Sequence, residues 1–197
     1  MTTEEMGKLR GSSLAPYIQI ATVLIGKSRL SGGNMFRHQL DTMAILIDYN
    51  YIDSVLLKAS IIHDVLEDVP DYNHNLILGV DYESHLVYEL VREVTKVPGE
   101  TKAEFLTRIL EKGSMNAKIL KVADRISNMI SLGFVNTAEF VKRYTSETEQ
   151  YIFPIAEIVN HNMLTELKDL VASRKKYLAD IAKIESITTV SDSTDFF

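Results

Sequence analysis

The sequence predicts an all-α fold of about nine helices in a single domain. Apolar residues recur at helical spacing along most of the chain, and no segment shows strand-like alternation or an internal repeat. A length of 197 residues suits one domain with a sizeable core. We expect this domain to span 13–186, between a flexible N-terminus at 1–12 and a disordered tail at 187–197.

The expected helix boundaries follow breaks and capping residues. Pro16 is tolerated in the first turn of a helix, while Asp53 and Pro70 are typical of a helix start and stop. Thr101 and Glu104 have the spacing of a capping box, in which each side chain bonds the backbone N–H of the other, and Ser114 can cap the helix that follows. The predicted helices span about 14–26, 36–49, 53–69, 81–95, 101–112, 115–132, 133–143, 146–160 and 163–185.

The composition excludes several classes of function. A net charge of −6, without a block of five like charges, argues against general binding to nucleic acid or to an anionic membrane. Because cysteine is absent, a transition-metal site must use His, Asp and Glu. No apolar run approaches the roughly 18 residues of a membrane span, and the acidic N-terminus lacks a signal-peptide core. We therefore expect a cytoplasmic protein. Its oligomeric state is not readable from the sequence, and a homodimer is one option.

The loop at 27–34 combines two cations, hydroxyl groups and a pair of glycines, and His38 follows it at the start of the next helix. Backbone N–H groups and cations in such a loop can surround an anion. The planar guanidinium of Arg29 suits either a nucleobase or a phosphate. The simpler interpretation is a plain connection between helices, and the loop taken alone favours it.

Four ionisable residues, His63, Asp64, Glu67 and Asp68, interrupt the apolar run of the helix expected at 53–69. His63 and Glu67 are four residues apart, as are Asp64 and Asp68, so each pair shares a helix face. Carboxylates on a mostly buried helix are costly unless they are paired or bound to a metal. A divalent cation would remove that cost. The alternative is an exposed acidic helix end that happens to contain a histidine.

A second polar stripe lies in the helix expected at 115–132. Asp124 follows a nearly apolar run, and Asn128 comes four residues later on the same face. A buried Asp124 could simply be neutralised by Lys121 or Arg125. The stripe also suits a metal ligand followed by groups that bind a substrate.

The candidate metal ligands are thus His38, His63, Asp64 and Asp124. Imidazole and carboxylate ligands suit Mn²⁺, Fe²⁺, Co²⁺ or Zn²⁺. Four protein ligands on a six-coordinate ion would leave positions for water and a substrate oxygen, and such an ion lowers the pKa of water and polarises a phosphoryl group. Glu67 and Asp68, one turn further on, are placed to orient that water or to carry its proton.

The order and spacing of these residues resemble the HD superfamily of metal-dependent phosphohydrolases, and most closely the (p)ppGpp hydrolase domain of the RelA/SpoT homologues. The resemblance covers about residues 14–160, and the length suits the small, single-domain alarmone hydrolases. Four ordered blocks carry it: Arg29-x-x-Gly32 followed by His38; His63-Asp64-Val65-Leu66-Glu67-Asp68; Val94-Thr95-Lys96 with Thr101-Lys102; and Lys121-Val122-Ala123-Asp124-Arg125-Ile126-Ser127-Asn128-Met129.

This resemblance implies an HD-type helical bundle that holds one Mn²⁺ ion on the four candidate ligands and uses Glu67 and Asp68 as the catalytic pair. It implies that Arg29 stacks on guanine and that Ser31, Asn128 and Tyr151 contact the nucleotide. The implied reaction removes pyrophosphate from the 3′ position of ppGpp or pppGpp and leaves GDP or GTP.

The chain departs from the family pattern around the first ligand, at Leu30, where a cation is common, and at Ser127, where a histidine is common. These departures leave room for another HD phosphohydrolase, such as a ppApp hydrolase, a nucleotidase or an NADPH phosphatase. A non-catalytic nucleotide-binding module is a third interpretation. An antidote to a separate alarmone synthetase is a related biological role that one sequence does not test.

Overall fold

The computed structural model describes residues 2–30, 33–135 and 137–191, with side chains up to residue 180 except that of residue 134. In these ranges the chain is helical, and its only β-type pairing is an isolated bridge between Ser28 and Asn34, so the all-α prediction is confirmed. The α-helices are α1 (Thr3–Gly11), α2 (Ala15–Ala21), α3 (Met35–Asp48), α4 (Ser54–Ile62), α5 (Val65–Asp68), α6 (Asn75–Leu78), α7 (Ser84–Val94), α8 (Lys102–Lys112), α9 (Met115–Ser131), α10 (Ala138–Glu147), α11 (Phe153–Val159) and α12 (His161–Ser191).

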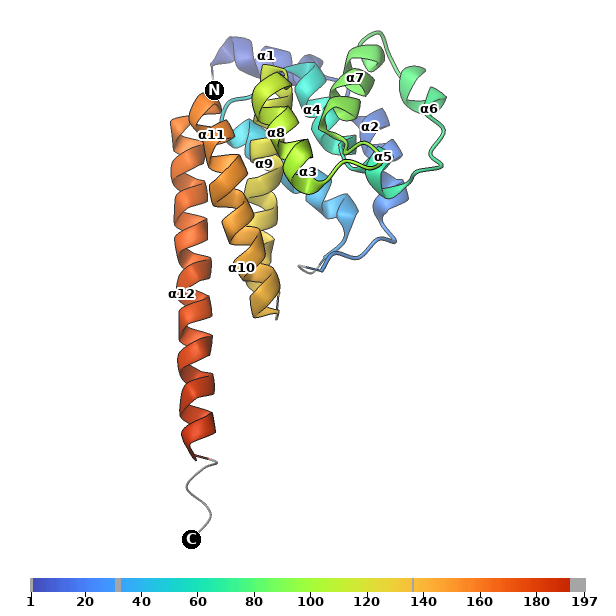
Figure 1. Ribbon diagram of the computed structural model, residues 1–197. Helices are drawn as coiled ribbons and strands as arrows, with labels where there is room; N and C mark the ends of the chain where they lie inside the picture. The colour runs from blue at the N-terminus through green and yellow to red at the C-terminus, as the bar shows by residue number, and fades with distance from the viewer. Residues whose placement is uncertain (1, 31–32, 136, 192–197) are drawn as a thin grey trace.

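Helix α9 is the centre of the structure (Figure 1). It packs against α3, α7, α11 and α12, while α4 packs against α2, α3 and α7. Helix α12 continues well beyond the other helices (Figure 1). Within the described ranges, no helix combines the length and the apolarity needed to cross a membrane.

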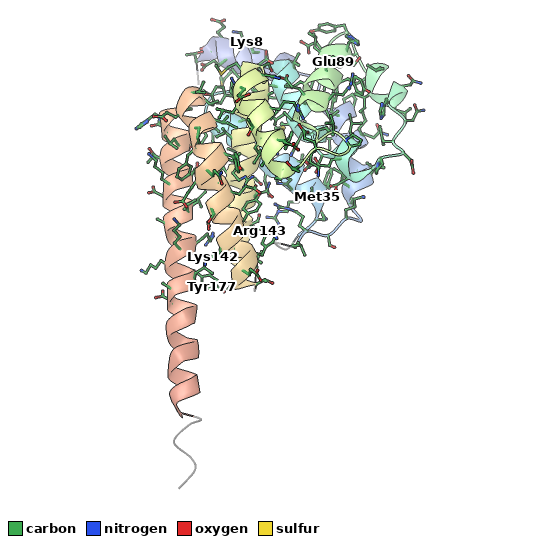
Figure 2. All side chains as sticks on the ribbon, viewed as in Figure 1. Lys8, Met35, Glu89, Lys142, Arg143 and Tyr177 are labelled. Atoms are coloured by element: carbon green, nitrogen blue, oxygen red, sulfur yellow. The ribbon has the colours of Figure 1, made fainter. Side chains whose placement is uncertain are left out.

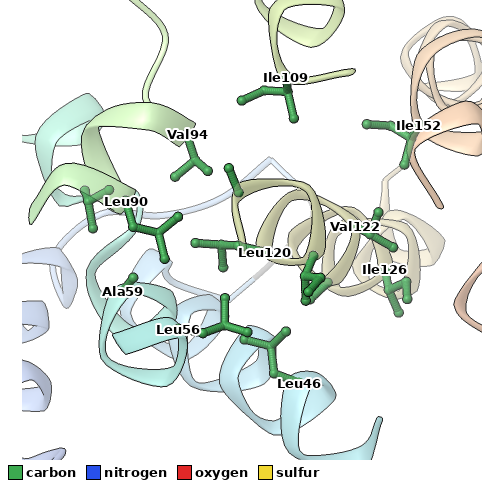
Figure 3. Packing of buried hydrophobic residues seen from close by; sticks show 14 of the residues in the cluster. Leu46, Leu56, Ala59, Leu90, Val94, Ile109, Leu120, Val122, Ile126 and Ile152 are labelled. Carbon is green, nitrogen blue, oxygen red and sulfur yellow. The ribbon is translucent and has the colours of Figure 1, made fainter. Parts of the chain in front are cut away.

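The hydrophobic core lies where α3, α4, α7 and α9 meet (Figure 3). Leu46, Leu56, Leu90 and Leu120, one from each of these helices, are at most 6% exposed. Full burial of a leucine side chain contributes about 2 kcal/mol relative to its exposure. The core therefore fixes the relative positions of the helices that carry the candidate ligands.

Two capping signals in the sequence have the expected geometry. Thr101 accepts a hydrogen bond from the N–H of Glu104, whose carboxylate accepts one from the N–H of Thr101, which is the capping box that starts α8. Ser114 caps α9 by accepting from the N–H of Ala117. Because α9 starts at a defined residue, the face on which Asp124 lies is defined as well.

The continuous helix predicted at 53–69 is wrong, because α4 ends at Ile62 and α5 begins at Val65. The side chains of His63 and Gln39 explain this break. His63 Nδ1 donates to the carbonyl oxygen of Ser60 (2.7 Å), the acceptor that the N–H of Asp64 would use in a regular helix. The N–H of Asp64 donates instead to Gln39 Oε1 (3.3 Å). Side-chain partners thus replace a backbone bond and end the helix.

The two ends of the chain differ from the prediction in part. Helix α1 occupies 3–11, within the segment expected to be flexible, and buries none of its residues. Helix α12 runs to Ser191, beyond the expected end near 185. Residues 192–197 of the predicted tail lie outside the described residues, so the disorder of the tail and the domain limits stay predictions.

A buried ion cluster joins α4 to the segment before α7. Lys58 Nζ, with 2% of its side chain exposed, lies 2.8 Å from Asp81 Oδ2 and 2.5 Å from Glu83 Oε2. The Lys58 hydrogen bond lowers the pKa of Glu83 below its usual range. Burial alone would raise the pKa of Asp81, but its hydrogen bonds, that from Lys58 first among them, outweigh burial and lower this pKa as well. These carboxylates therefore stabilise the fold fully above about pH 4, near the pKa values that they have in the unfolded chain. Their contribution is lost as the pH falls through the lower pKa values that they have in the folded protein.

Replacing Lys58 by methionine is expected to lower the free energy of unfolding by about 3 kcal/mol at pH 7, because two carboxylates lose their buried cation. The difference from the wild type should shrink below about pH 4 as the carboxylates gain protons. Urea denaturation across pH 3–7 measures both effects. Lys112→Met, at an exposed position of α8, is the matched control and should change stability by less than about 0.5 kcal/mol.

Candidate active site

The four candidate metal ligands come together from three parts of the chain. His38 lies in the first turn of α3, His63 and Asp64 lie between α4 and α5, and Asp124 lies on α9. Ligand atoms of His38, His63 and Asp124, all buried, lie within 4.8 Å of one another. Asp64 Oδ2 lies 3.5 Å from His38 Nε2 and 3.2 Å from His63 Nε2. The buried group is therefore able to bind a metal ion.

Both imidazoles are oriented through the nitrogen that faces away from this group. Nδ1 of His63 donates to the Ser60 carbonyl, and Nδ1 of His38 lies 2.9 Å from Ser127 Oγ. Their Nε2 atoms face the carboxylates, and Nε2 of His63 is buried without a hydrogen-bond partner. A metal-binding histidine usually has this arrangement, in which one ring nitrogen makes a hydrogen bond to the protein and the other faces the ion. The residues present thus fit a divalent metal.

The two carboxylates are held from outside the group. Gln39 Nε2 donates to Asp64 Oδ2 (2.8 Å), and Lys121 Nζ donates to Asp124 Oδ2 (2.6 Å). The sequence suggested Lys121 as a partner of Asp124, but it did not indicate Gln39, because nothing in its spacing connects it to a residue 25 positions later. The sequence offered neutralisation of Asp124 by Lys121 as the alternative to a metal site. In the structure Lys121 does bond Asp124, and the four candidate ligands converge as well.

Opposite charges dominate the protonation of the group. Burial alone would lower the pKa of His63, but Asp64 and Asp124 outweigh it and raise that pKa to about 10. Burial would raise the pKa of Asp124, yet Lys121 and the two histidines hold it well below its usual range. The carboxylates of the site are therefore negative and attract positive charge, which a divalent cation would supply in place of the His63 proton.

The two candidate catalytic acids differ in their exposure. Glu67 is exposed, whereas Asp68 is half-buried and its Oδ2 atom is buried without a hydrogen-bond partner. Burial and the neighbouring Asp64 raise the pKa of Asp68, and Lys27 acts in the opposite direction. Lys27 also donates to the backbone carbonyl of Asp68. A carboxyl group with a raised pKa next to a metal site is suited to proton transfer.

A cavity of about 260 Å³ opens beside Arg29. It is lined by Ser28, Arg29, Leu30, Met35, Asn128, Leu132, Phe140 and Tyr144. The rings of Phe140 and Tyr144 are stacked at 5.7 Å with an interplanar angle of 21°. Figure 2 labels Met35, at the start of α3, which lines the cavity, and Arg143 on α10, the helix that carries Phe140 and Tyr144. The cavity combines aromatic faces with one guanidinium.

The other predicted substrate residues have different positions. Asn128 lines the cavity and bonds Arg29, whereas Ser31 lies outside the described residues. Tyr151 lies in the π-helical turn Thr148–Ile152, packs against the core and is not among the lining residues, so its contact with a nucleotide stays a prediction. Tyr144, on the preceding helix, lines the cavity but was not selected from the sequence, where no spacing set it apart.

Three positively charged side chains, Lys102, Lys121 and Arg125, lie close to one another near the candidate ligand Asp124. The ammonium groups of Lys102 and Lys121 lie 5.3 and 5.1 Å from the centre of the Phe105 ring, and the Arg125 guanidinium lies 4.2 Å from the centre of the Tyr144 ring. The positive charge of Lys121 lowers the pKa of Lys102, an exposed residue, to about 8. Lys121 and Arg125 have carboxylate partners in Asp124 and Glu147. The closely spaced cations favour an anionic ligand.

No protein-family model matches the chain. It is 31% identical over 179 residues to a probable guanosine-3′,5′-bis(diphosphate) 3′-pyrophosphohydrolase of Mycoplasma pneumoniae, 28% identical over 183 residues to the enzyme of that name from Vibrio cholerae, and 28% identical over 157 residues to the bifunctional (p)ppGpp synthase/hydrolase SpoT of Escherichia coli. These matches cover 80%, 86% and 74% of this chain. The chain spans only 24%, 24% and 21% of the relatives' lengths.

A solved structure has the same fold. It belongs to a metazoan ortholog of SpoT that is described as hydrolysing ppGpp, and it matches with a TM-score of 0.67 at 23% identity. The match covers 88% of this chain and 97% of the other. The resemblance stated from the sequence motifs is thereby confirmed: the chain has the helical fold of this SpoT ortholog and is similar in sequence to proteins named as (p)ppGpp 3′-pyrophosphohydrolases.

Proposed function

We propose that this protein is a divalent-metal-dependent hydrolase that removes pyrophosphate from the 3′ position of (p)ppGpp-type alarmones. The observation that carries the proposal is the convergence of His38, His63, Asp64 and Asp124, with the buried Nε2 atom of His63 facing the two carboxylates but making no hydrogen bond. The names of the similar proteins support the substrate class. Mn²⁺ is the ion that we propose, because the resemblance to the (p)ppGpp hydrolases implies it and because two imidazoles and two carboxylates suit it, as they also suit Fe²⁺, Co²⁺ or Zn²⁺.

A bound divalent ion would lower the pKa of water and polarise the phosphoryl group at the 3′ position. The chain's own residues would do the rest. Asp68, with its raised pKa, would accept the proton of the attacking water, and the exposed Glu67 would pass a proton to the 3′ oxygen as its bond to phosphorus breaks. Water thus adds to the phosphorus atom that carries the 3′ oxygen, the bond between that phosphorus and the 3′ oxygen breaks, and the products are pyrophosphate and a nucleotide with a free 3′ hydroxyl group.

The remaining groups would hold the substrate. The edges of the Arg29 guanidinium bond Asn128 and Ser131, so its flat face is the part available to stack on a purine beside Phe140 and Tyr144. Lys102 and Lys121 would neutralise the pyrophosphate. Small nucleotides are therefore the proposed partners, and the cytoplasmic location remains a prediction.

The test is product analysis of ppGpp incubated with the purified chain and Mn²⁺, with Asp64→Ala as the control. We expect equimolar GDP and pyrophosphate from the wild type and neither product from the variant. Parallel reactions with ppApp, NADPH and simple nucleotides separate the alternative phosphohydrolase activities. If ppGpp remains intact with Mn²⁺ and with the other divalent metals, the proposal is wrong; nucleotide binding without turnover of any substrate would favour a binding module.

A further inference from the structure

Asn128 lies between the candidate metal site and the nucleotide cavity. Its Nδ2 atom donates to Asp124 Oδ1 and to the backbone oxygen of Asp124, the latter at 3.0 Å. Its Oδ1 atom accepts from Arg29 Nη2 at 2.6 Å. Two hydrogen bonds therefore connect the arginine of the loop to a metal ligand.

The chemistry of the two neighbours fixes the orientation of this amide. A carboxylate only accepts hydrogen bonds and a guanidinium only donates them. If the amide were flipped, its N–H groups would face the guanidinium and its oxygen would face the carboxylate, so both bonds would be lost. Asn128 and Asp124 are four residues apart on α9, which holds the two side chains on one face.

The bond to Asp124 reaches the oxygen that faces the metal site. Asp124 Oδ1 lies 3.0 Å from His38 Nε2 and 3.8 Å from His63 Nε2, whereas Oδ2 points to Lys121. The carboxylate is thus held from both sides. Partners of this kind, one shell outside the ligands, usually set metal affinity by orienting the ligand.

The bond to Arg29 reaches the group that faces the cavity. Arg29 Nη1 donates to Ser131 Oγ at 3.2 Å, so the guanidinium is held on α9 by two side chains. Of these two, only Asn128 also contacts a candidate metal ligand. Any displacement of Asp124 would be transmitted to Arg29 through this amide, and the reverse holds as well.

We propose that Asn128 is a positioning residue that couples the two sites, so that a bound metal and a bound nucleotide each strengthen the binding of the other. The inference rests on the proposed function, because it takes a divalent metal and a purine nucleoside as the two ligands. Each ligand orders the same two hydrogen bonds, those of Asn128 to Arg29 and to Asp124. The ligand that binds second therefore pays less of the cost of ordering them. The coupling is reciprocal by thermodynamic necessity.

The experiment is calorimetric titration of the full chain with Mn²⁺, in the absence and presence of guanosine. Guanosine is the probe because it lacks the phosphates that would chelate Mn²⁺ in solution. We expect guanosine to raise the Mn²⁺ affinity of the wild type by about fivefold or more. In Asn128→Ala, the Mn²⁺ affinity should fall by about 10- to 100-fold, and guanosine should no longer change it.

Two further variants separate coupling from damage to the fold. Ser131→Ala removes the other bond of Arg29 but does not touch Asp124, so its Mn²⁺ affinity without guanosine should stay within about twofold of the wild type. Asn128→Asp keeps the shape and the acceptor for Arg29 but loses the N–H donor to Asp124. This variant should still bind guanosine, while the effect of guanosine on Mn²⁺ affinity disappears.

An equal guanosine effect in the wild type and both Asn128 variants would overturn the inference, as would a wild type in which guanosine has no effect. The inference and the proposed function fail in different ways. Turnover of ppGpp without coupling would remove only the role of Asn128. Coupling without turnover of ppGpp would remove only the proposed reaction.

Discussion

Replacing Asp124 by asparagine is expected to lower kcat/KM for ppGpp hydrolysis by at least about 10³-fold, which corresponds to about 4 kcal/mol of transition-state stabilisation. Asp124 Oδ1 faces the Nε2 atoms of both histidines, so its charge is central to binding a cation there. Asparagine keeps the volume and an oxygen for Lys121 but removes the negative charge. The measurements are initial rates of pyrophosphate release at several Mn²⁺ concentrations and a calorimetric Mn²⁺ titration.

Stability must be followed in the same variant, because Lys121 is buried and loses its counterion. Circular dichroism and thermal melting show whether the fold is retained, and Asp41→Asn, at an exposed position on α3, is the matched control. A folded Asp124→Asn protein that keeps more than about a tenth of the wild-type activity would show that the metal centre is assigned to the wrong residues. We expect the control to retain wild-type activity and Mn²⁺ affinity.

The second large effect is expected for Asp68→Asn. General acid–base catalysis typically contributes 10²- to 10⁴-fold, so we expect kcat to fall by about that factor. The affinity for Mn²⁺ should stay within about threefold of the wild type, because the metal ligands are retained. Asp68 thus differs from Asp124, whose replacement is expected to weaken metal binding itself. Steady-state kinetics with a Mn²⁺ titration separates the two cases.

The pH profile gives an independent measure of the role of Asp68. Burial and Asp64 raise its pKa, so the carboxylate gains a proton at a higher pH than an ordinary aspartate. A residue that must accept a proton is inactive once protonated, so the wild-type rate should fall on the acidic side above the usual aspartate range. This limb should be absent from Asp68→Asn and present in Asp71→Asn, an exposed control in the segment that follows. An unchanged acidic limb in Asp68→Asn would assign it to another group.

Local chemistry along the chain was sufficient for much of the fold. The capping pair Thr101–Glu104 and the cap Ser114 predict where α8 and α9 begin, because a capping bond spans only three residues. The helical periodicity predicts the all-α class for the same reason, since it depends on near neighbours. His63, Asp64 and Asp124 were recognisable because imidazole and carboxylate groups inside apolar runs are costly without a partner, whereas His38 was a candidate because it begins the helix that leads into His63 and Asp64.

Contacts between distant segments decided the rest. The helix at 53–69 divides because Gln39, from α3, takes the N–H of Asp64, and no local signal predicts a bond across 25 positions. The cavity beside Arg29 takes Tyr144 from α10, and Asn128 acquires its two partners only when the loop packs on α9. By itself, the sequence determined which groups carry the proposed chemistry and where most helices lie. The tertiary structure decided which oxygen or nitrogen of each group faces the site, because that choice depends on partners supplied by other helices.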